Sequence, residues 1–167
     1  MAGLGHIAVG LAAGRLYARG PEARAQFWFA ALAMLPDLDV LGFRFGVPYG
    51  STFGHRGASH ALAVAVVAGT VFGFGAWLLR GRSLLRTSLF SIAVLASHGL
   101  LDAMTDGGRG IALLWPMTSA RYFAPWTPIP VAPIGAGMLS ARGFHVTLVE
   151  LVEFSPLLLY ALWPRRR

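Results

Sequence analysis

Residues 57–79 have the sequence GASHALAVAVVAGTVFGFGAWLL, a run of 23 residues without a formal charge. A helix needs about 20 mainly apolar residues to cross the roughly 30 Å hydrocarbon core of a bilayer. Arg80 and Arg82 follow the run directly, where a spanning helix would reach the lipid headgroups. The stretch therefore predicts a transmembrane helix and an integral membrane protein.

The composition of the whole chain also indicates a membrane environment. Of its 167 residues, 56% are hydrophobic and 13% are charged, whereas an average soluble domain has about 25% charged residues. All fourteen basic residues are arginine, and they lie mostly in short runs between apolar segments. This distribution is typical of membrane topology signals, so we expect the lipid bilayer as a partner and no nucleic acid. The chain has no cysteine, so any metal must be held by nitrogen and oxygen ligands.

We predict an all-α fold, a polytopic membrane helical bundle of about five helices, in a single domain over residues 1–167. The predicted helical segments are 3–18, 24–36, 57–79, 84–104 and 144–163. The first two are short for full spans. They can be tilted, covered by neighbouring helices, or paired as a helical hairpin through the link at 19–22.

Arginines accumulate at the links between the predicted segments. Three lie in each of the ranges 15–24, 80–86 and 165–167, which together hold nine of the fourteen. If all five segments cross the membrane, these nine lie on one side, and short cytoplasmic loops carry the excess of arginine. We therefore predict a bacterial-type inner membrane protein with a cytoplasmic C-terminus.

Histidine and aspartate gather at the opposite predicted side. Every histidine and every aspartate lies at or near that end: His6, Asp37, Asp39, His55, His60, His98, Asp102, Asp106 and His145. An Asp at the bilayer centre costs about 2.5 to 3.5 kcal/mol, so such residues are usually paired or functional. The pattern predicts a functional site at the extracytoplasmic end of the helices.

One motif lies on the fourth segment. His98 and Asp102 are four residues apart, so on a helix both side chains lie on one face and can share a cation. An ordinary hydrogen bond within the helix is the alternative.

A second motif, GHRGASH at 54–60, precedes the third segment. His55 and His60 are suited to bind a divalent metal there, and Arg56 supplies a planar fork for a phosphate or carboxylate. The alternative is an interfacial loop whose histidines only meet lipid headgroups.

Two shorter patterns complete the set. Asp37 and Asp39 follow Pro36, which predicts a helix boundary, and their carboxylates can bridge metals or orient a ligand imidazole. A solvated turn is the alternative for them, and an exposed terminus is the alternative for His6. Together with the two motifs, these residues predict a zinc or manganese centre of the kind used for hydrolysis, with enough ligands for two ions.

The motifs resemble those of the YdjM-type family of membrane-bound, metal-dependent hydrolases. The shared elements are GH at 5–6, LPDLD at 35–39, GHRGASH at 54–60 and SHGLLDAMTDGG with LLWP at 97–116. That family is distantly similar to the zinc-dependent phospholipase C and P1 nuclease superfamily, which is all-helical and cleaves phosphoesters at a site with several metals.

The resemblance implies a ligand set of His6, Asp37, His60, His98 and Asp102. It implies that Asp39 and His55 are ligands or outer partners, and that one to three divalent ions bind, zinc first and manganese second. The soluble enzymes close their site with a downstream HxxxE pattern. Here Glu150 and Glu153 follow His145 at offsets of five and eight, so the roles of these three residues and of Asp106 stay open.

We predict a metal-dependent hydrolase of the phospholipase type that acts on the phosphoester of a lipid or lipid-linked anionic substrate. The catalytic group is assigned to Asp39, His55 and Arg56. The aromatic and proline-rich stretch 115–135 is expected at the membrane interface, as a substrate platform or only as an anchor. Arg109, Arg121 and Arg142 can attract an anionic headgroup or stay solvated.

Two other functions stay open. The first is a lipid amide or ester hydrolase or an intramembrane protease, although the chain lacks the HExxH motif of the common zinc proteases. The second is a metal-binding membrane protein that transports, senses or scaffolds. Transport needs a polar path, whereas segment 57–79 is apolar toward its arginine end.

Overall fold

The computed structural model describes residues 3–164, and within them it is helical, with no β-strand and two isolated β-bridges. Its α-helices are α1 (Leu4–Ala18), α2 (Ala23–Ala33), α3 (Leu62–Arg80), α4 (Leu84–Ala103), α5 (Ala141–Glu153) and α6 (Ser155–Leu162). Its 3₁₀-helices are η1 (Leu35–Phe45), η2 (Ala58–His60) and η3 (Gly135–Leu139). The predicted all-α class is confirmed.

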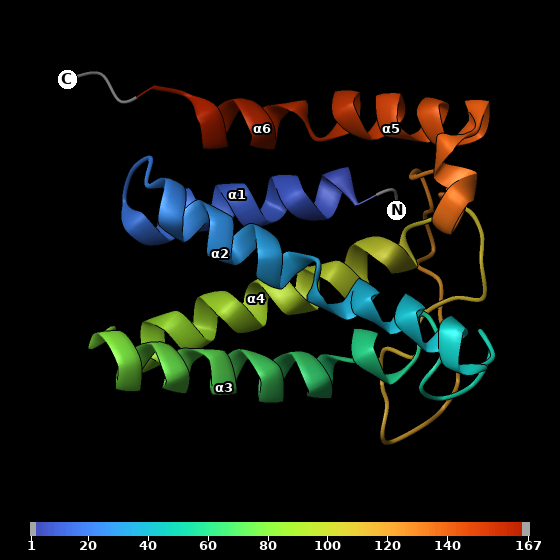
Figure 1. The fold of residues 1–167 in the computed structure, drawn as a ribbon, viewed down its shortest axis with the longest axis horizontal. Helices are drawn as coiled ribbons and strands as arrows, with labels where there is room; N and C mark the ends of the chain where they lie inside the picture. Colours follow the sequence, from blue (N-terminus) through green and yellow to red (C-terminus); the bar gives the residue numbers. More distant parts are fainter. Residues whose placement is uncertain (1–2, 165–167) are drawn as a thin grey trace.

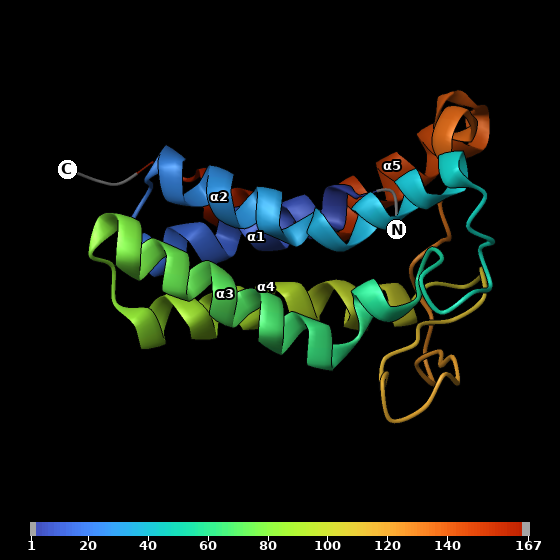
Figure 2. The same ribbon diagram turned by 60° about the horizontal axis from the view of Figure 1, so that its bottom comes forward.

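The helices form two hairpins with a third layer beside them (Figure 1). Helix α1 packs against α2, and α3 packs against α4, while α6 and α5 lie along α1. Figures 1 and 2 show that the links after α1 and α3 lie at one end of the bundle and the long loops at the other. The predicted hairpin of the first two segments therefore forms, and α1 is also covered by α4, α5 and α6, which is another of the predicted arrangements.

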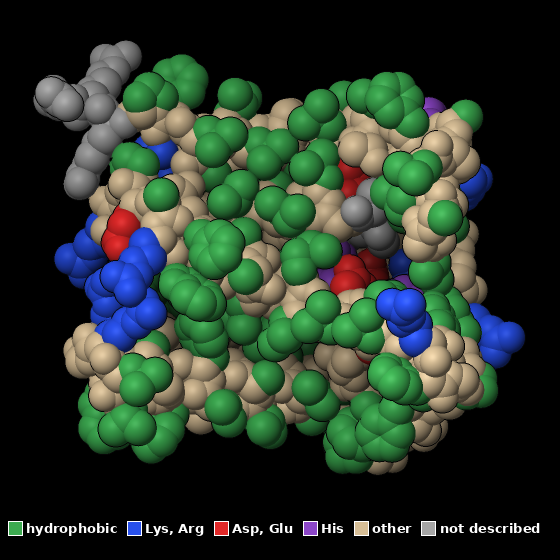
Figure 3. Space-filling model, in the orientation of Figure 1, with side chains coloured by type: hydrophobic (Ala, Val, Ile, Leu, Met, Phe, Trp, Pro, Cys, Tyr) green, Lys and Arg blue, Asp and Glu red, His purple; other side chains and the backbone are tan. Residues whose placement is uncertain are grey.

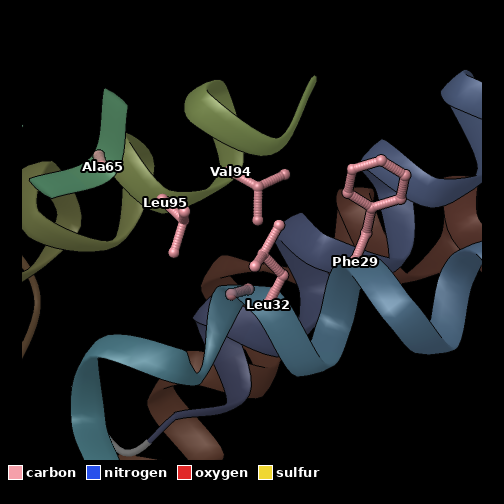
Figure 4. Close-up of a cluster of buried hydrophobic side chains, with 6 residues drawn as sticks. Phe29, Leu32, Ala65, Val94 and Leu95 are labelled. Atoms are coloured by element: carbon pink, nitrogen blue, oxygen red, sulfur yellow. The ribbon is translucent and has the colours of Figure 1, made fainter. Parts of the chain in front are cut away.

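The core lies where α2 crosses the α3–α4 hairpin. Phe29 and Leu32 of α2 point toward Val94 and Leu95 of α4, with Ala65 of α3 completing the cluster (Figure 4). All five are at most 6% exposed. This close apolar contact packs the two hairpins against each other, and between helices in lipid such contacts stabilise through van der Waals packing.

Small residues let the helices of each hairpin approach closely. A Cβ added at Gly10 would lie 2.5 Å from the backbone of α2, and one added at Gly14 would meet α2 equally closely. On α3, Gly69 and Gly73 meet α4 in the same way. Close packing of small residues is a main source of helix association in membranes, where lipid is as apolar as leucine.

We expect Gly73→Leu to lower the apparent melting temperature of the purified protein. Its Cβ would lie 2.7 Å from the Ser88 backbone nitrogen, and overpacking of this kind typically costs about 1 to 3 kcal/mol. Val71→Leu is the control, since it enlarges a side chain of the same helix that is 65% exposed. Equal melting temperatures for both variants would contradict the close α3–α4 contact.

The outer surface of the bundle is apolar. Helices α3 and α4 are long and apolar enough to cross a membrane, with mean hydropathies of 2.1 and 1.5. Two bent pairs raise the number of candidate spans to four: α2 with η1, at 44°, and α5 with α6, at 63°. Val67, Val71 and Leu79 of α3 are each at least 65% exposed, as expected for side chains that face lipid. Hydrophobic side chains cover much of the face in Figure 3.

Three predicted helix boundaries are wrong. The second segment stops being α-helical at Ala33 and continues as the 3₁₀-helix η1, in a range expected to be mostly loop. The last segment begins at Ala141 instead of 144 and bends between α5 and α6. Pro36 and Pro156 stand at the first turns of η1 and α6, where a missing N–H breaks the preceding hydrogen-bond ladder.

The third predicted segment also starts late, at Leu62 instead of 57. Ala61 is extended and Arg56 has a positive φ of 62°, so the chain between them forms a loop with one short 3₁₀ turn. This local departure from the helix is what turns His60 inward. The three arginines predicted for the cytoplasmic side at 165–167 lie outside the described residues.

Candidate metal centre

Five predicted ligands meet at the end of the bundle opposite to the arginine-rich links. His6 comes from α1, Asp37 from η1, His60 from η2, and His98 and Asp102 from α4. All except Asp37 are at most 3% exposed. Figure 3 shows acidic and histidine side chains at the bottom of a hollow at this end. The fold thus brings together residues that are up to 96 positions apart in the sequence.

The ligand-type atoms of this group are close to one another. The Asp102 carboxylate lies 3.4 Å from Nε2 of His6 and 3.4 Å from Nε2 of His60. Asp37 Oδ1 lies 3.4 Å from His98 Nε2 and 3.6 Å from His60 Nε2. One such atom from each of Asp37, His60, His98 and Asp102 falls within 4.8 Å of all the others, so the four could hold a metal ion.

The hydrogen bonds of two imidazoles direct their Nε2 atoms into this cluster. His98 Nδ1 lies 2.7 Å from the Ala33 carbonyl, which can only accept, so Nδ1 carries the proton. Ser59 donates to Asp39 at 2.6 Å, so its oxygen accepts the Nδ1–H of His60 at 2.9 Å. In the neutral form that a metal requires, each ring would therefore present the lone pair of Nε2 to the cluster, which is how metal-binding histidines are usually oriented.

The carboxylates around His60 favour a positive charge at the centre of the cluster. Burial opposes protonation of His60, but the carboxylates of Asp102, Asp37 and Asp39 outweigh it and raise the pKa of this imidazole to about 10. The two Nε2 atoms of His60 and His98 are only 3.1 Å apart. A cation at this point, either a proton or a metal ion, is what the surrounding groups stabilise.

His6 is a further donor at the edge of this cluster. Its ring stacks on His98 at 3.7 Å, its Nε2 lies 3.4 Å from the Asp102 carboxylate, and neither ring nitrogen makes a well-formed hydrogen bond among residues 3–164. An unsatisfied buried polar group is costly and is rare in native proteins. A metal ion would satisfy this imidazole, so the donor set fits the predicted centre.

Asp39 organises a second group beside the first. It accepts from His55 Nδ1 at 2.7 Å, from the Arg56 backbone N–H at 3.2 Å and from Ser59. Its carboxylate also lies 3.3 Å from His60 Nδ1. Asp39 therefore orients two imidazoles at once, and Asp39, His55 and His60 form a second set that could hold an ion.

Arg56 is buried, with 2% of its surface exposed. Its NH1 group donates to the hydroxyl of Thr105 and to the Gly107 carbonyl, each at 2.9 Å. Its Nε lies 3.4 Å from Asp102, without a hydrogen-bond partner among the described residues. These contacts fix the position of Asp102 and of the chain after α4, so Arg56 has a positioning role that its sequence motif does not indicate.

A cavity of about 610 Å³ opens beside both groups. Its polar wall is formed by Asp37, Tyr49, His55, Arg56 and Asp102. Its apolar wall comes from η1 and from residues 131–138, including Leu38, Val131 and Ile134. The end of the predicted aromatic and proline-rich platform therefore borders the site, whereas Trp126 is 70% exposed and lies outside the cavity lining.

Four acidic or histidine residues had no role assigned from the sequence. The structure places two of them away from the cluster and two in contacts that hold nearby backbone. His145 and Glu153 are exposed on α5 and do not join the cluster. Asp106 is exposed and accepts from the Val131 backbone at 2.6 Å, so it anchors the loop that borders the cavity. Glu150 is buried and accepts from the Gly5 backbone at 3.1 Å, next to His6.

Arg121 has a supporting role that sequence reasoning missed. Its guanidinium donates to the carbonyls of Tyr49, Ser51, His55, Arg56 and Gly110. It thereby holds the GHRG loop in place instead of facing solvent. Four of these five partners are 65 to 72 positions away, so no local pattern could have indicated this contact. Ser59 and Thr105 also have supporting roles, but they lie within the motifs GHRGASH and SHGLLDAMTDGG, so the sequence could have indicated them.

Comparison with known proteins agrees with these motifs. The profile of the family described as "YdjM inner membrane protein" matches residues 1–164. The chain is 46% identical over 142 residues to the "Inner membrane protein YbcI" of Escherichia coli (strain K12), with 81% of each chain covered. No solved structure matches the chain significantly. The chain therefore belongs to the YdjM family of inner membrane proteins.

Proposed function

We propose that this protein is a membrane-embedded, metal-dependent hydrolase that cleaves a phosphoester in a lipid or lipid-linked substrate. The observation that carries the proposal is the buried convergence of His6, His60 and His98 with two carboxylates. In the neutral form, two of these imidazoles would present Nε2 lone pairs, and the third makes no well-formed hydrogen bond among the described residues. Such a set stabilises a cation and would be costly without one.

The five clustered residues would hold the ion. Nitrogen and oxygen donors of this kind suit zinc or manganese, and we propose zinc. The group of Asp39, His55 and His60 would hold a further ion only in place of the Nδ1 protons that face Asp39 and Ser59, within the proposed range of one to three. A bound divalent ion would supply an acidified water, with a pKa lowered toward about 7, and a polarised scissile group.

His55 and Arg56 would act on the substrate from the cavity wall. Because Asp39 holds the Nδ1–H of His55 at 2.7 Å, the opposite ring nitrogen can take or return a proton in the reaction. Arg56 would contribute positive charge to the cavity wall, while its NH1 donors stay engaged by Thr105 and Gly107. Its contacts with Asp102 and Thr105 keep that charge in a fixed position.

The cavity favours a substrate with an anionic group and an apolar part. Charged and polar residues form one wall and apolar residues the other. Phe123 and Trp126, in the preceding loop, are exposed, and such aromatic side chains favour the membrane interface. We propose that the site faces the extracytoplasmic interface, as the arginine distribution predicts.

Metal analysis combined with product analysis tests this function. We expect the purified wild-type protein to contain zinc or manganese and to release a phosphorylated product from a phosphoester lipid. Removal of the metal by a chelator should abolish this release, and adding zinc or manganese should restore it. Hydrolysis that survives metal removal, or release only from amide or carboxylic-ester lipids, would overturn the proposal. Bound metal without turnover of any of these lipids would favour the non-enzymatic alternative.

A further inference from the structure

A second hollow lies at the other end of the bundle, between the start of α2 and the end of α3. Its volume is about 280 Å³, and its walls are mainly apolar. Trp28 and Phe29 of α2 face it from one side, and Phe72, Gly75 and Leu79 of α3 line it from the other. We call it the α2–α3 groove. It takes no part in the proposed hydrolase site.

Gly75 keeps this groove open. The neighbouring glycines of α3, Gly69 and Gly73, have a packing function because α4 lies against them. A Cβ at Gly75 would meet no atom within 4 Å. Glycine is disfavoured in a helix interior unless close approach or special backbone geometry requires it. Here the missing side chain leaves free space on a helix that is long enough to span the membrane.

Positive charge surrounds the mouth of the groove. Arg24, Arg80 and Arg82 line it together with one acidic residue, Glu22. Arg82 lies 3.9 Å from Glu22 in an exposed pair, and the Arg80 guanidinium lies 5.8 Å from the centre of the Trp28 ring. Figure 3 shows basic side chains gathered at one edge of the face, with an acidic group among them. The rim therefore has a net charge favourable to an anion.

The apolar walls and the arginines of the groove are separated along α3 in the way that the acyl chains and the headgroup of a lipid are. Phe72 and Arg80 are eight residues apart on α3, which corresponds to about 12 Å along a helix. The apolar walls thus lie at the depth of acyl chains, and the arginines lie at the depth of headgroups, where such side chains are stable. Basic pockets between membrane helices are suited to anionic lipid headgroups.

We propose that the α2–α3 groove binds an anionic phospholipid. One acyl chain lies along Gly75 and Phe72, and the phosphate is held by Arg24, Arg80 and Arg82. A second copy of this chain is disfavoured as the occupant, because two such positively charged rims would repel each other. The rim lies roughly 27 Å along α3 from its first residue, so this site is separate from the metal centre.

Native mass spectrometry of the full chain tests the proposal. The protein is taken from detergent micelles that contain equal amounts of phosphatidylglycerol and phosphatidylcholine. We expect wild-type protein to retain phosphatidylglycerol in preference to phosphatidylcholine. Arg24→Gln and Arg80→Gln should each lower this preference about fivefold, which corresponds to the ~1 kcal/mol expected per arginine near an anionic headgroup.

Gly75→Leu should remove the bound lipid, because the new side chain starts in the groove from a Cβ that has no protein atom within 4 Å. Two matched controls should retain it. Arg44→Gln removes an exposed arginine at the opposite end, and Val71→Leu enlarges an exposed side chain of α3 outside the groove. Equal retention of the two lipids by wild-type protein would overturn the proposal. So would unchanged retention in both Arg24→Gln and Gly75→Leu, or a bound mass equal to a second chain.

Discussion

His98→Ala is expected to abolish metal binding and to lower hydrolysis at least about 100-fold, because losing even an outer partner of a metal ligand costs about 10- to 100-fold. His98 is fully buried, and its Nε2 lies 3.4 Å from Asp37 and 3.1 Å from His60 Nε2. No other described side chain could replace it without rearranging α4. Elemental analysis and the lipid phosphoester assay measure the two effects on the same preparation.

A further variant must show that the loss of metal in His98→Ala does not result from unfolding of the protein. His98→Gln keeps a side-chain donor that can reach the Ala33 carbonyl, to which His98 now donates, so this variant should fold while still losing the metal. His145→Ala is the matched control, since it removes an exposed histidine outside the cluster. Full metal content and full activity in folded His98→Gln and His98→Ala would defeat the proposed centre.

Asp39→Asn is expected to lower activity about 10- to 100-fold while leaving the chain folded. The carboxylate accepts hydrogen bonds from His55, Ser59 and the Arg56 backbone and lies 3.3 Å from His60 Nδ1. An asparagine has the same shape, but its NH₂ group cannot accept. One imidazole or the serine hydroxyl must therefore lose its partner and its fixed orientation.

The split between metal content and turnover identifies the role of Asp39. If it orients ligands and a proton-transferring imidazole, metal affinity should fall less than the rate, and the pH dependence of the remaining activity should change. Asp106→Asn is the control, because the side chain of that aspartate is exposed and outside the metal cluster, and an asparagine oxygen can still accept from the Val131 backbone. Equal activity of Asp39→Asn and wild-type protein would remove Asp39 from the mechanism.

The membrane character of the chain and the local elements of the site follow from sequence. The uncharged run at 57–79 predicts a span because hydrocarbon excludes charge over a known thickness, and α3, which ends at Arg80, is a helix long and apolar enough to cross a membrane. The four-residue spacing of His98 and Asp102 predicts a shared helix face, and both side chains do point into one cluster. Because arginines lie at every second link between the predicted segments, the sequence also predicts that the histidines and aspartates lie together at the opposite end of the bundle.

Other features depend on contacts between residues far apart in the chain. The sequence does not show that Arg121 binds the GHRG loop or that Glu150 holds the start of α1. It also leaves Arg56 as a free anion fork, whereas packing places its guanidinium against Asp102 and Thr105.

The sequence by itself therefore determined the solvent of the protein, its helical class, its family motifs and the residues available to a metal. These depend on composition and on spacing within single segments. Only the tertiary structure decided which histidine nitrogens face inward, which carboxylate orients them, and which glycine leaves an open groove instead of packing against a helix. Such choices depend on distances between separate helices, and no spacing within one segment encodes them.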